Sequence, residues 1–215
     1  MSTHRKVYPS FAEESDLISE GYEPVAGLDE AGRGSLAGPV VAAAVILPTN
    51  IRANWVRLIN DSKRMSAHQR EYVYSRLHEH ALAISVGKSS SIEIDRINIL
   101  EATRLAMKRA LENLAVRPQF LLIDALTLPT IPINQKPIIH GDTISMSIAA
   151  ASIIAKVTRD KIMRNNDDDY PGYGFAKHKG YGTREHLRNL TLLGPCTIHR
   201  FSFRPVRSIN HSFKR

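Results

Sequence analysis

Two adjacent acids, Asp29 and Glu30, stand at the end of an apolar stretch in the sequence VAGLDEAGRG. Neighbouring side chains of a regular strand point to opposite faces, so these acids can serve one site only if the strand ends or bulges there. Gly32 and Gly34 follow at once, and glycine permits such a departure from regular geometry. We therefore expect an irregular strand end that brings both carboxylates to one place.

Two further acids also follow apolar stretches. Asp124 ends the run FLLID, and Asp142 stands in PIIHGD, after Pro137, Ile138 and Ile139. A single acid in such a place is most often a helix cap or a turn residue, and Asp142 before ISMSIAAAS fits that interpretation. Several together favour a site, because parallel strands bring their carboxyl ends to one edge of a sheet, where α/β folds place ligands.

Four carboxylates at one edge of a sheet would repel one another unless cations lay between them. Carboxylate oxygens are hard ligands that suit Mg²⁺ or Mn²⁺, with water and substrate phosphate completing the coordination. Two such ions can activate a water and stabilise the leaving oxygen in phosphodiester hydrolysis. The pattern therefore predicts a metal-dependent phosphoryl-transfer enzyme. Asp167, Asp168 and Asp169 follow no apolar strand, and we expect them in a solvated loop.

The apolar pattern predicts the elements that position these acids. Strands are expected at 25–29, 39–47, 81–90, 120–126 and 137–142, the first two as an antiparallel pair. Helices are expected from the N-cap Ser66 to about 80, over 91–99 and 100–114, over about 143–165 and over about 183–193. This order describes an α/β fold with a mixed five-stranded sheet flanked by helices. One main domain covers 21–206, with a helical C-terminal part, a lead-in at 1–20 and a basic tail at 207–215.

Composition narrows the class of protein. The 215 residues are 43% hydrophobic, which is typical of a globular chain with one sizeable core. The sequence contains no run of about 18 apolar residues, so it predicts no membrane span. The first residues lack the apolar segment of a secretory signal, and the single Cys196 excludes an internal disulfide and a cysteine-based zinc site. We therefore expect a cytoplasmic protein.

The chain is basic, with a net charge of +8 and a pI of about 9.7. Such a balance favours anionic partners, nucleic acid above all. The basic residues concentrate at 178–188 and 199–215, where a solvated face or a frayed tail is the alternative explanation.

Several motifs together resemble the bacterial ribonuclease HII family in order and spacing, from about residue 22 to 206. They are GLDEAGRGSLAGPVV, DSKRMS, LLIDAL, GDTISMSIAAASIIAKVTRD, YPGYGFAKHKGYGT and GPCTIHRFSF. The resemblance implies the ribonuclease H-like fold. It also implies an endonuclease that cleaves the RNA strand of RNA–DNA hybrids and incises duplex DNA 5′ to embedded ribonucleotides, as in ribonucleotide excision repair. The implied products carry 3′-hydroxyl and 5′-phosphate ends.

By this resemblance, Asp29, Glu30, Asp124 and Asp142 are the catalytic acids and bind two divalent ions, Mn²⁺ or Mg²⁺. Where the sequence departs from the family, Ser35 stands in place of a common Pro, Ala125 in place of Gly, and His140 in place of Lys. None of these departures removes a predicted metal ligand.

The resemblance also assigns residues to the substrate. The backbone of Gly32–Arg33–Gly34 would contact the 2′-hydroxyl beside the cut, and Tyr181 would stack on the sugar that follows the ribonucleotide. Lys63 and residues 177–179 are candidates for phosphate contacts, although each could be a surface charge. A tight loop that needs glycine and a tyrosine that anchors a loop are the structural alternatives.

Two other functions remain open at this point. A ribonuclease HIII relative would need an additional N-terminal substrate-binding domain, for which about twenty residues before the first strand are too few. A hybrid-binding module without catalysis is the second alternative, and the four acids argue against it. A monomer is the default expectation for the oligomeric state.

Overall fold

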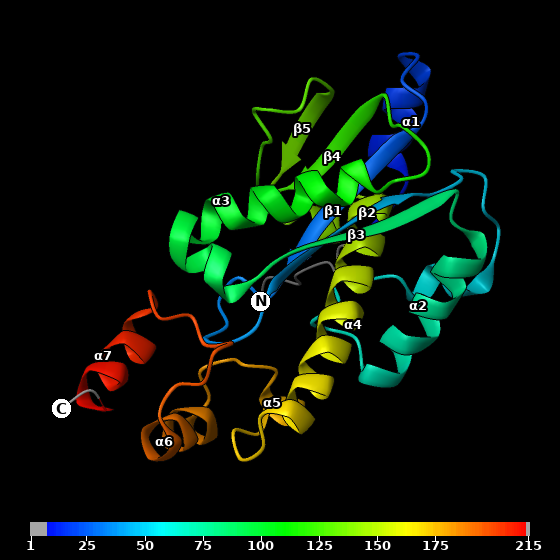
Figure 1. Cartoon of the computed structure of the whole chain (residues 1–215). Helices are drawn as coiled ribbons and strands as arrows, with labels where there is room; N and C mark the ends of the chain where they lie inside the picture. Colours follow the sequence, from blue (N-terminus) through cyan, green and yellow to red (C-terminus); the bar gives the residue numbers. More distant parts are fainter. Residues whose placement is uncertain (1–7, 214–215) are drawn as a thin grey trace, which may run out of the picture.

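Five strands form one mixed sheet in the computed structural model, which describes residues 8–213 (Figure 1). They are β1 (Val25–Ala31), β2 (Val40–Ile46), β3 (Ala83–Ser89), β4 (Phe120–Asp124) and β5 (Asn134–Ile138). The order across the sheet is β3-β2-β1-β4-β5. β1 and β3 run antiparallel to β2, whereas β1, β4 and β5 are mutually parallel. The predicted mixed five-stranded sheet is confirmed.

Helices cover both faces of this sheet. They are α1 (Ala12–Ser19), α2 (Ala67–His80), α3 (Ser91–Glu112), α4 (Met146–Asp169), α5 (Phe175–His178), α6 (Arg184–Leu193) and α7 (Arg204–Phe213), with 3₁₀ helices η1 (Asn54–Leu58) and η2 (Gly141–Thr143). α3 packs on one face of the sheet and α4 on the other, with α2 beside α4 (Figure 1). α5, α6 and α7 gather beyond one end of the sheet (Figure 1). None of the described helices is long and apolar enough to cross a membrane.

The helix starts follow from their capping residues. Ser66 caps α2 as predicted, and its side chain forms a capping box with Gln69. Ser90 caps α3 in the same way. The two helical stretches predicted over 91–114 meet at Asn98, which has a left-handed φ of 66° and kinks α3. The Asn98 Oδ1 accepts from the backbone N–H of Leu100, so this residue restarts the helix after the kink.

Small residues bring α4 close to β1. Ala149, Ala150 and Ala151 are fully buried where α4 packs against the sheet and α2. A Cβ at Gly27 would lie 2.2 Å from the backbone carbon of Ser147, so only glycine fits under the helix. The side chains on the next turns of α4 therefore reach the end of β1.

Two sequence predictions are wrong in their placement. The fifth strand spans Asn134–Ile138 rather than 137–142, because this edge strand is mostly polar and pairs only with β4. Ile139, which we expected inside the strand, is 73% exposed. Asp142 therefore lies on η2 and not at a strand end. Asp167–Asp169 form the last turn of α4 rather than a loop.

The predicted ends of the chain are partly described. The lead-in contains α1, which packs onto the sheet through the buried Leu17. Glu14 accepts hydrogen bonds from the Ser145 hydroxyl and the Ser147 backbone at the start of α4. The predicted basic tail is helical as far as Phe213, in α7. Residues 1–7 and 214–215 of the lead-in and the tail lie outside the described residues.

Candidate active site

The strand that carries Asp29 and Glu30 stays regular to its end. Both acids pair one-to-one with β2, and so does Ala31, so the predicted strand end or bulge at the acids is wrong. The neighbouring strand β4 stops instead: its parallel pairing with β1 ends at Leu28, and Asp124 is its last residue. The acids therefore lie along an open edge of β1, beside the end of β4.

Regular pairing places the two acids on opposite faces of the sheet. Asp29 lies on the face that α4 covers, and burial raises its pKa well above the ordinary value. The charges of Glu30 and Asp124 raise the pKa of Asp29 further, while Ser152 on α4 partly offsets the rise through hydrogen bonding. Burial also raises the pKa of Glu30, and the Asp124 charge adds to it. Asp124 thus acts electrostatically on both acids.

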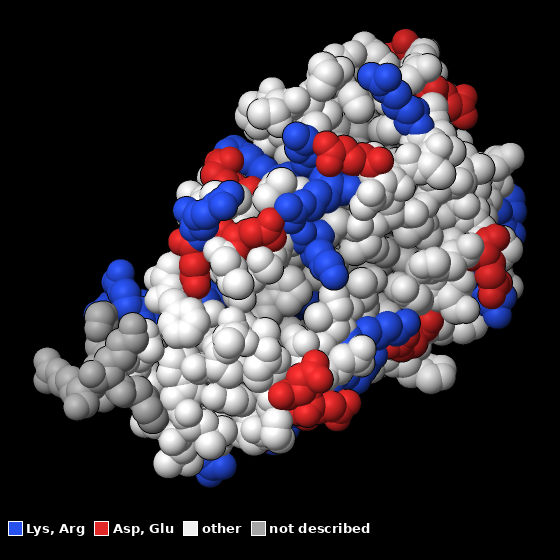
Figure 2. Space-filling model, viewed as in Figure 1, with Lys and Arg blue, Asp and Glu red and all other residues white. Residues whose placement is uncertain are grey.

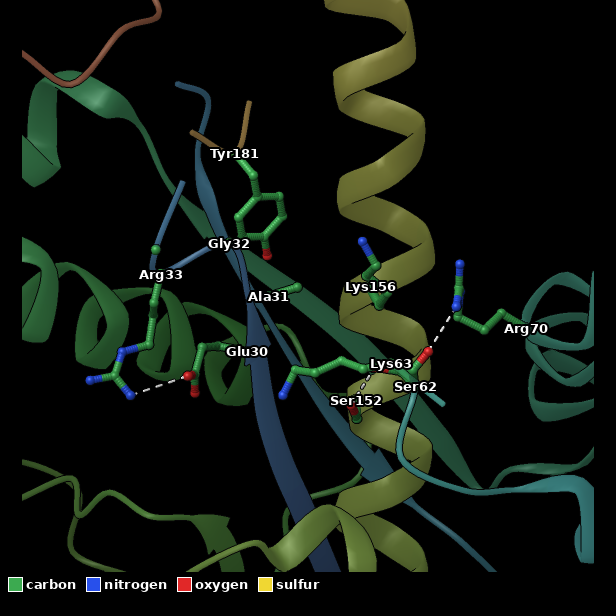
Figure 3. A pocket seen from close by; sticks show the side chains of 11 residues that line it. Glu30, Ala31, Gly32, Arg33, Ser62, Lys63, Arg70, Ser152, Lys156 and Tyr181 are labelled. Atoms are coloured by element: carbon green, nitrogen blue, oxygen red, sulfur yellow. Dashed lines mark hydrogen bonds and ion pairs between the residues drawn. The ribbon is translucent and has the colours of Figure 1, made fainter. Parts of the chain in front are cut away.

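Glu30 has one oxygen in an ion pair and one without a partner. Its Oε1 lies 3.3 Å from the Arg33 Nη1 (Figure 3). Its Oε2 is buried and makes no hydrogen bond. Lys63 reaches toward Glu30 (Figure 3), and the attraction of Arg33 and Lys63 partly opposes the rise in the Glu30 pKa. A buried carboxylate oxygen without a partner is costly unless a cation or donor approaches it.

Asp124 and Asp142 are joined through the turn η2. The Asp124 Oδ1 accepts from the Gly141 backbone N–H at 2.7 Å, next to Asp142. The flanking residues Ala125 and His140 have left-handed φ values of 50° and 56°. This conformation favours glycine, which explains why glycine is common at the position of Ala125 in the family that the sequence resembles.

Asp61 is a fifth acid that the sequence analysis missed. Burial raises the pKa of Asp142, and the charges of Asp61 and Asp124 add to the rise. Asp61 also accepts from the Lys63 backbone N–H at 2.9 Å, so it shapes the turn that carries Lys63. Partial burial lowers the pKa of the Lys63 ammonium group. The charges of the nearby acids, led by Asp142, outweigh this effect, so the pKa is raised. The motif DSKRMS contained Asp61, but no apolar strand precedes it.

The turn that carries Lys63 is fixed to both α2 and α4. The Ser62 hydroxyl lies 2.9 Å from the Ser152 hydroxyl on α4. Arg70 on α2 donates to the Ser62 carbonyl at 2.8 Å (Figure 3) and also to the Met65 carbonyl. Arg70 is a further residue that sequence reasoning did not single out, because its role depends on packing between separate elements.

A cavity of about 570 Å³ opens beside Glu30 (Figure 3). Its lining brings together Glu30, residues 32–34, Lys63 and Tyr181, which were predicted as site residues from distant parts of the sequence. Lys156 also lines it and was missed, although it lies one helical turn after Ser152, which also lines the cavity. The other three predicted acids do not line this cavity, and they act on it electrostatically, through Glu30 and Lys63.

A buried arginine holds the loop that follows β1. Arg200 is fully buried and donates to the carbonyl oxygens of Gly32 at 2.7 Å, Arg33 at 2.8 Å and Gly38 at 2.9 Å. In a trans peptide the carbonyl and the following N–H point in opposite directions. The N–H groups of Arg33 and Gly34 therefore point away from Arg200. The loop turns its carbonyls inward and these two donors outward.

A second buried arginine joins this loop to Tyr181. Arg159 donates to the Ala37 carbonyl at 3.1 Å and to the Lys179 carbonyl at 3.0 Å. Its guanidinium carbon lies 5.5 Å from the centre of the Tyr181 ring, and the Lys156 ammonium lies 5.9 Å from it. The predicted Tyr181 is thus held beside the glycine loop, with its ring next to two cations.

The two glycines of the loop differ in what the fold asks of them. Gly32 has a φ of +95°, and a Cβ there would lie 1.9 Å from the Arg159 Nε. Gly34 lies outside the left-handed region, and a Cβ there would meet nothing within 4 Å. Packing therefore requires glycine at 32, whereas nothing in the protein requires it at 34.

The candidate phosphate contacts at 177–179 are mostly engaged within the protein. His178 is buried, with its ring hydrogen-bonded to the Tyr173 carbonyl and the Gly180 N–H, so it is not a surface contact for phosphate. Lys177 is paired with Glu185.

Charge on the visible face does not mark a binding surface by itself. In Figure 2, basic and acidic side chains are interspersed over this face of the molecule. Some basic side chains are also paired within the protein, as in the ion pairs Arg104–Glu101 and Arg109–Glu93 on α3. The location of the site therefore depends on the acids and the loops rather than on net charge.

The donor chemistry of the acids fits a hard divalent cation. Within residues 8–213, no three His, Cys, Asp or Glu side chains are poised to hold a metal ion as they stand. Asp29 and Asp124 each use one oxygen to accept from a backbone N–H, and Glu30 pairs with Arg33. The unpartnered Glu30 Oε2 and the mutually repelling, desolvated carboxylates are nevertheless what an oxygen-ligated cation would relieve.

Comparisons with known proteins agree with this arrangement. A sequence model described as Ribonuclease HII matches residues 26–206. Ribonuclease HII of Desulfitobacterium hafniense (strain Y51) is 56% identical over 195 residues, 91% of this chain and 74% of that protein. Ribonuclease HII of Dehalococcoides mccartyi (strain ATCC BAA-2266 / KCTC 15142 / 195) is 49% identical over 203 residues, 94% of this chain and 96% of that protein. The crystal structure of ribonuclease H2 from Pyrococcus horikoshii OT3 superposes with a TM-score of 0.71 and 27% identity, covering 89% of this chain and 99% of that one.

Proposed function

Because this chain belongs to the ribonuclease HII family, we propose how its residues carry out the reaction of that family. The family consists of metal-dependent endoribonucleases that cleave RNA in RNA–DNA hybrids and at ribonucleotides embedded in DNA. We assign Asp29, Glu30, Asp124 and Asp142 as the acids that hold two divalent ions. The observation that carries this assignment is their convergence at the end of β4, where each raised pKa has burial and a neighbouring acid among its causes.

The bound ions, Mg²⁺ or Mn²⁺, would activate a water and stabilise the departing 3′-oxygen, so that the products carry 3′-hydroxyl and 5′-phosphate ends. The four carboxylates would hold the ions and balance their charge, and none of these side chains needs to act as a nucleophile. Glu30 can offer both oxygens only when Arg33 releases it. The freed guanidinium then lies at the cavity, where it can bind a phosphate.

Recognition of the ribonucleotide falls to the loop at 32–34. A 2′-hydroxyl is the only feature of the sugar that separates RNA from DNA at a given site. The outward N–H groups of Arg33 and Gly34 are donors that can bond this hydroxyl without reading the base. The open space at Gly34 lets the sugar come close to the main chain, where a methyl group would intervene. Tyr181, which also lines the cavity, would stack on the next sugar.

Phosphate contacts come from the cations of the cavity. Lys63, Lys156 and Arg70 line it together with Arg33. Lys156 is held by Asp160 at 2.8 Å, which fixes its position along α4. Such contacts set the register of a duplex without sequence preference and weaken as salt increases.

The test is cleavage of a labelled DNA duplex that carries one ribonucleotide, with Mg²⁺ or Mn²⁺ and with EDTA. An all-DNA duplex is the substrate control, and an Asp29→Asn variant is the protein control. A metal-dependent nick 5′ to the ribonucleotide, lost in the variant, is the expected result. Cleavage of long hybrids but not of this duplex would refute the roles of residues 32–34 and Tyr181. Binding without any cleavage would leave only a hybrid-binding module.

A further inference from the structure

Three buried histidines lie next to Tyr181 and take no part in the chemistry above. His178 is 7% exposed, and His186 and His199 are fully buried. The rings of His178 and His186 stack with their centres 4.3 Å apart, and Phe175 packs edge-on against both. Polar rings in an apolar cluster are costly unless every ring nitrogen finds a partner.

His186 and His199 form a continuous chain of hydrogen bonds that ends at Tyr181. The Cys196 backbone N–H donates to the His199 Nδ1 at 3.0 Å. The His199 Nε2 lies 3.1 Å from the His186 Nε2. The His186 Nδ1 lies 2.9 Å from the Tyr181 carbonyl oxygen. Only the rings of His199 and His186 lie between the Cys196 N–H and the Tyr181 carbonyl in this series of hydrogen bonds.

The two ends of this chain determine where the protons lie. The Cys196 backbone N–H lies closer to the His199 Nδ1, at 3.0 Å, than the Cys196 carbonyl oxygen does, at 3.3 Å, so the His199 Nδ1 accepts and the His199 Nε2 carries the proton. The His186 Nε2 then accepts, and its Nδ1–H donates to the Tyr181 carbonyl. The reverse arrangement would set a bare His186 Nδ1 against a carbonyl oxygen. Burial lowers the pKa of both His186 and His199 to about 4, so both rings stay neutral at neutral pH.

The bond to the Tyr181 carbonyl fixes the main chain that carries the Tyr181 ring. This carbonyl also accepts from the Thr183 N–H at 2.8 Å, and the Tyr181 N–H donates to the His178 carbonyl at 3.0 Å. His186 is on α6, and His199 is on the segment before α7. The hydrogen bonds from the Cys196 N–H through His199 and His186 to the Tyr181 carbonyl, here called the relay, therefore connect the loop of Tyr181 to α6 and to the segment before α7.

We propose that His186 is a positioning residue that fixes Tyr181 for selection of a DNA–RNA junction, and that His199 sets the tautomer in which the His186 Nδ1–H donates. The inference rests on the proposed role of Tyr181. Neither histidine touches the substrate: His186 holds the Tyr181 carbonyl so that the ring presents one orientation to the sugar. A residue positioned in this way affects the choice between substrates more than the rate of hydrolysis itself.

Two substitutions of His186 separate positioning from stability. In His186→Asn the amide nitrogen takes the place of Nδ1 and still donates to Tyr181, whereas the bond from His199 is lost. In His186→Leu both bonds are lost. Selectivity is measured as kcat/KM for a duplex with one ribonucleotide divided by kcat/KM for a long hybrid. We expect selectivity to fall about 3- to 10-fold in His186→Leu, the equivalent of one hydrogen bond, and to stay within about 2-fold of the wild type in His186→Asn.

Thermal denaturation accompanies the kinetics, because both variants leave the ring Nε2–H of His199 without a partner and both should melt below the wild type. A merely structural role would lower selectivity in both variants alike, and that result would overturn the proposal. Wild-type selectivity in His186→Leu would overturn it as well.

Tyr181→Ala provides the reference for the underlying assignment. If its selectivity equals that of the wild type, the proposed role of Tyr181 is wrong and the inference falls with it. If Tyr181→Ala loses selectivity and His186→Leu does not, only the inference fails. The relay itself is tested on the wild type by ¹⁵N spectra of the histidine rings at neutral pH. A proton on His186 Nδ1 and on His199 Nε2 is expected, and the opposite tautomers would refute the relay.

Discussion

Gly34→Ala should separate the needs of the substrate from those of the fold. In the folded protein a Cβ at this position meets nothing within 4 Å, and the residue lies outside the left-handed region. Replacing glycine by alanine at such a position restricts the unfolded chain, so the free energy of unfolding should stay unchanged or rise by about 0.4–1 kcal/mol. Any loss of activity in this variant therefore cannot be ascribed to unfolding.

The expected loss follows from where the methyl group would lie. It would stand between the sugar and the N–H groups of Arg33 and Gly34 that point out of the loop. Losing a neutral hydrogen bond of about 0.5–1.5 kcal/mol corresponds to roughly 2- to 13-fold in kcat/KM. A displacement of the sugar by about 1 Å can lower the rate by about 10²-fold. We expect a fall of about 10- to 100-fold on a duplex with a single ribonucleotide.

The matched control is Gly32→Ala, two residues away in the same loop. Its φ of +95° is strained for alanine by about 1–2 kcal/mol, and the Cβ would collide with the Arg159 side chain. This variant should lose stability as well as activity. Initial rates at low substrate concentration and melting curves for both variants check the two expectations. A Gly34→Ala protein that cleaves at the wild-type rate would refute the close approach of the sugar at this residue.

Three other perturbations test the site and its supports. Asp29→Asn removes a buried carboxyl whose raised pKa makes its ionised form unfavourable in the folded state, so in EDTA at pH 7 the variant should melt above the wild type. Its cleavage should fall by more than about 100-fold, since changes outside the metal ligands alone lower activity by 10- to 100-fold. Arg200→Lys replaces a fork that serves three carbonyls with one ammonium group, and urea unfolding should show a loss of about 1–3 kcal/mol together with lower selectivity for ribonucleotides. Folding lowers the pKa of both His186 and His199 from 6.5 to about 4. Between pH 4 and pH 6.5 the folded state therefore binds fewer protons than the unfolded state. Stability should therefore fall as the pH is lowered from 6.5 toward 4, by at most about 3 kcal/mol for each ring, and urea unfolding of His186→Leu should show a smaller fall than the wild type.

The parts of the fold that the sequence predicted are those with a local signal. The strands that carry Asp29 and Asp124 are apolar, and the acid after each apolar run is visible along the chain. The capping box at Ser66 is equally local. The apolar pattern misplaces β5, because an edge strand with the sequence NQKPI needs no apolar residues, whereas the exposed Ile139 extends a short apolar run beyond the strand.

The supports of the site could not be predicted, because their partners lie far away in the sequence. Arg200 contacts the carbonyl of Gly32, 168 residues earlier. Arg159 contacts the carbonyl of Ala37, 122 residues earlier. Nothing near either arginine distinguishes it from a basic residue on a surface. Asp61 is similar, since its place beside Asp142 arises only when the turn before α2 meets η2.

The regular geometry of β1 explains why the doublet is Asp followed by Glu. We expected the strand to bend so that both carboxylates could share one side, but β1 stays regular and β4 ends beside it. Along the open edge, side chains from both faces can turn toward the end of β4. Asp29 needs only a short side chain on the face that α4 covers. Glu30 starts on the opposite face, and its additional methylene lets the carboxylate reach the edge, where the charge of Asp124 raises its pKa. Two acids on opposite faces can therefore serve one site without a bulge, because the neighbouring strand is the one that stops.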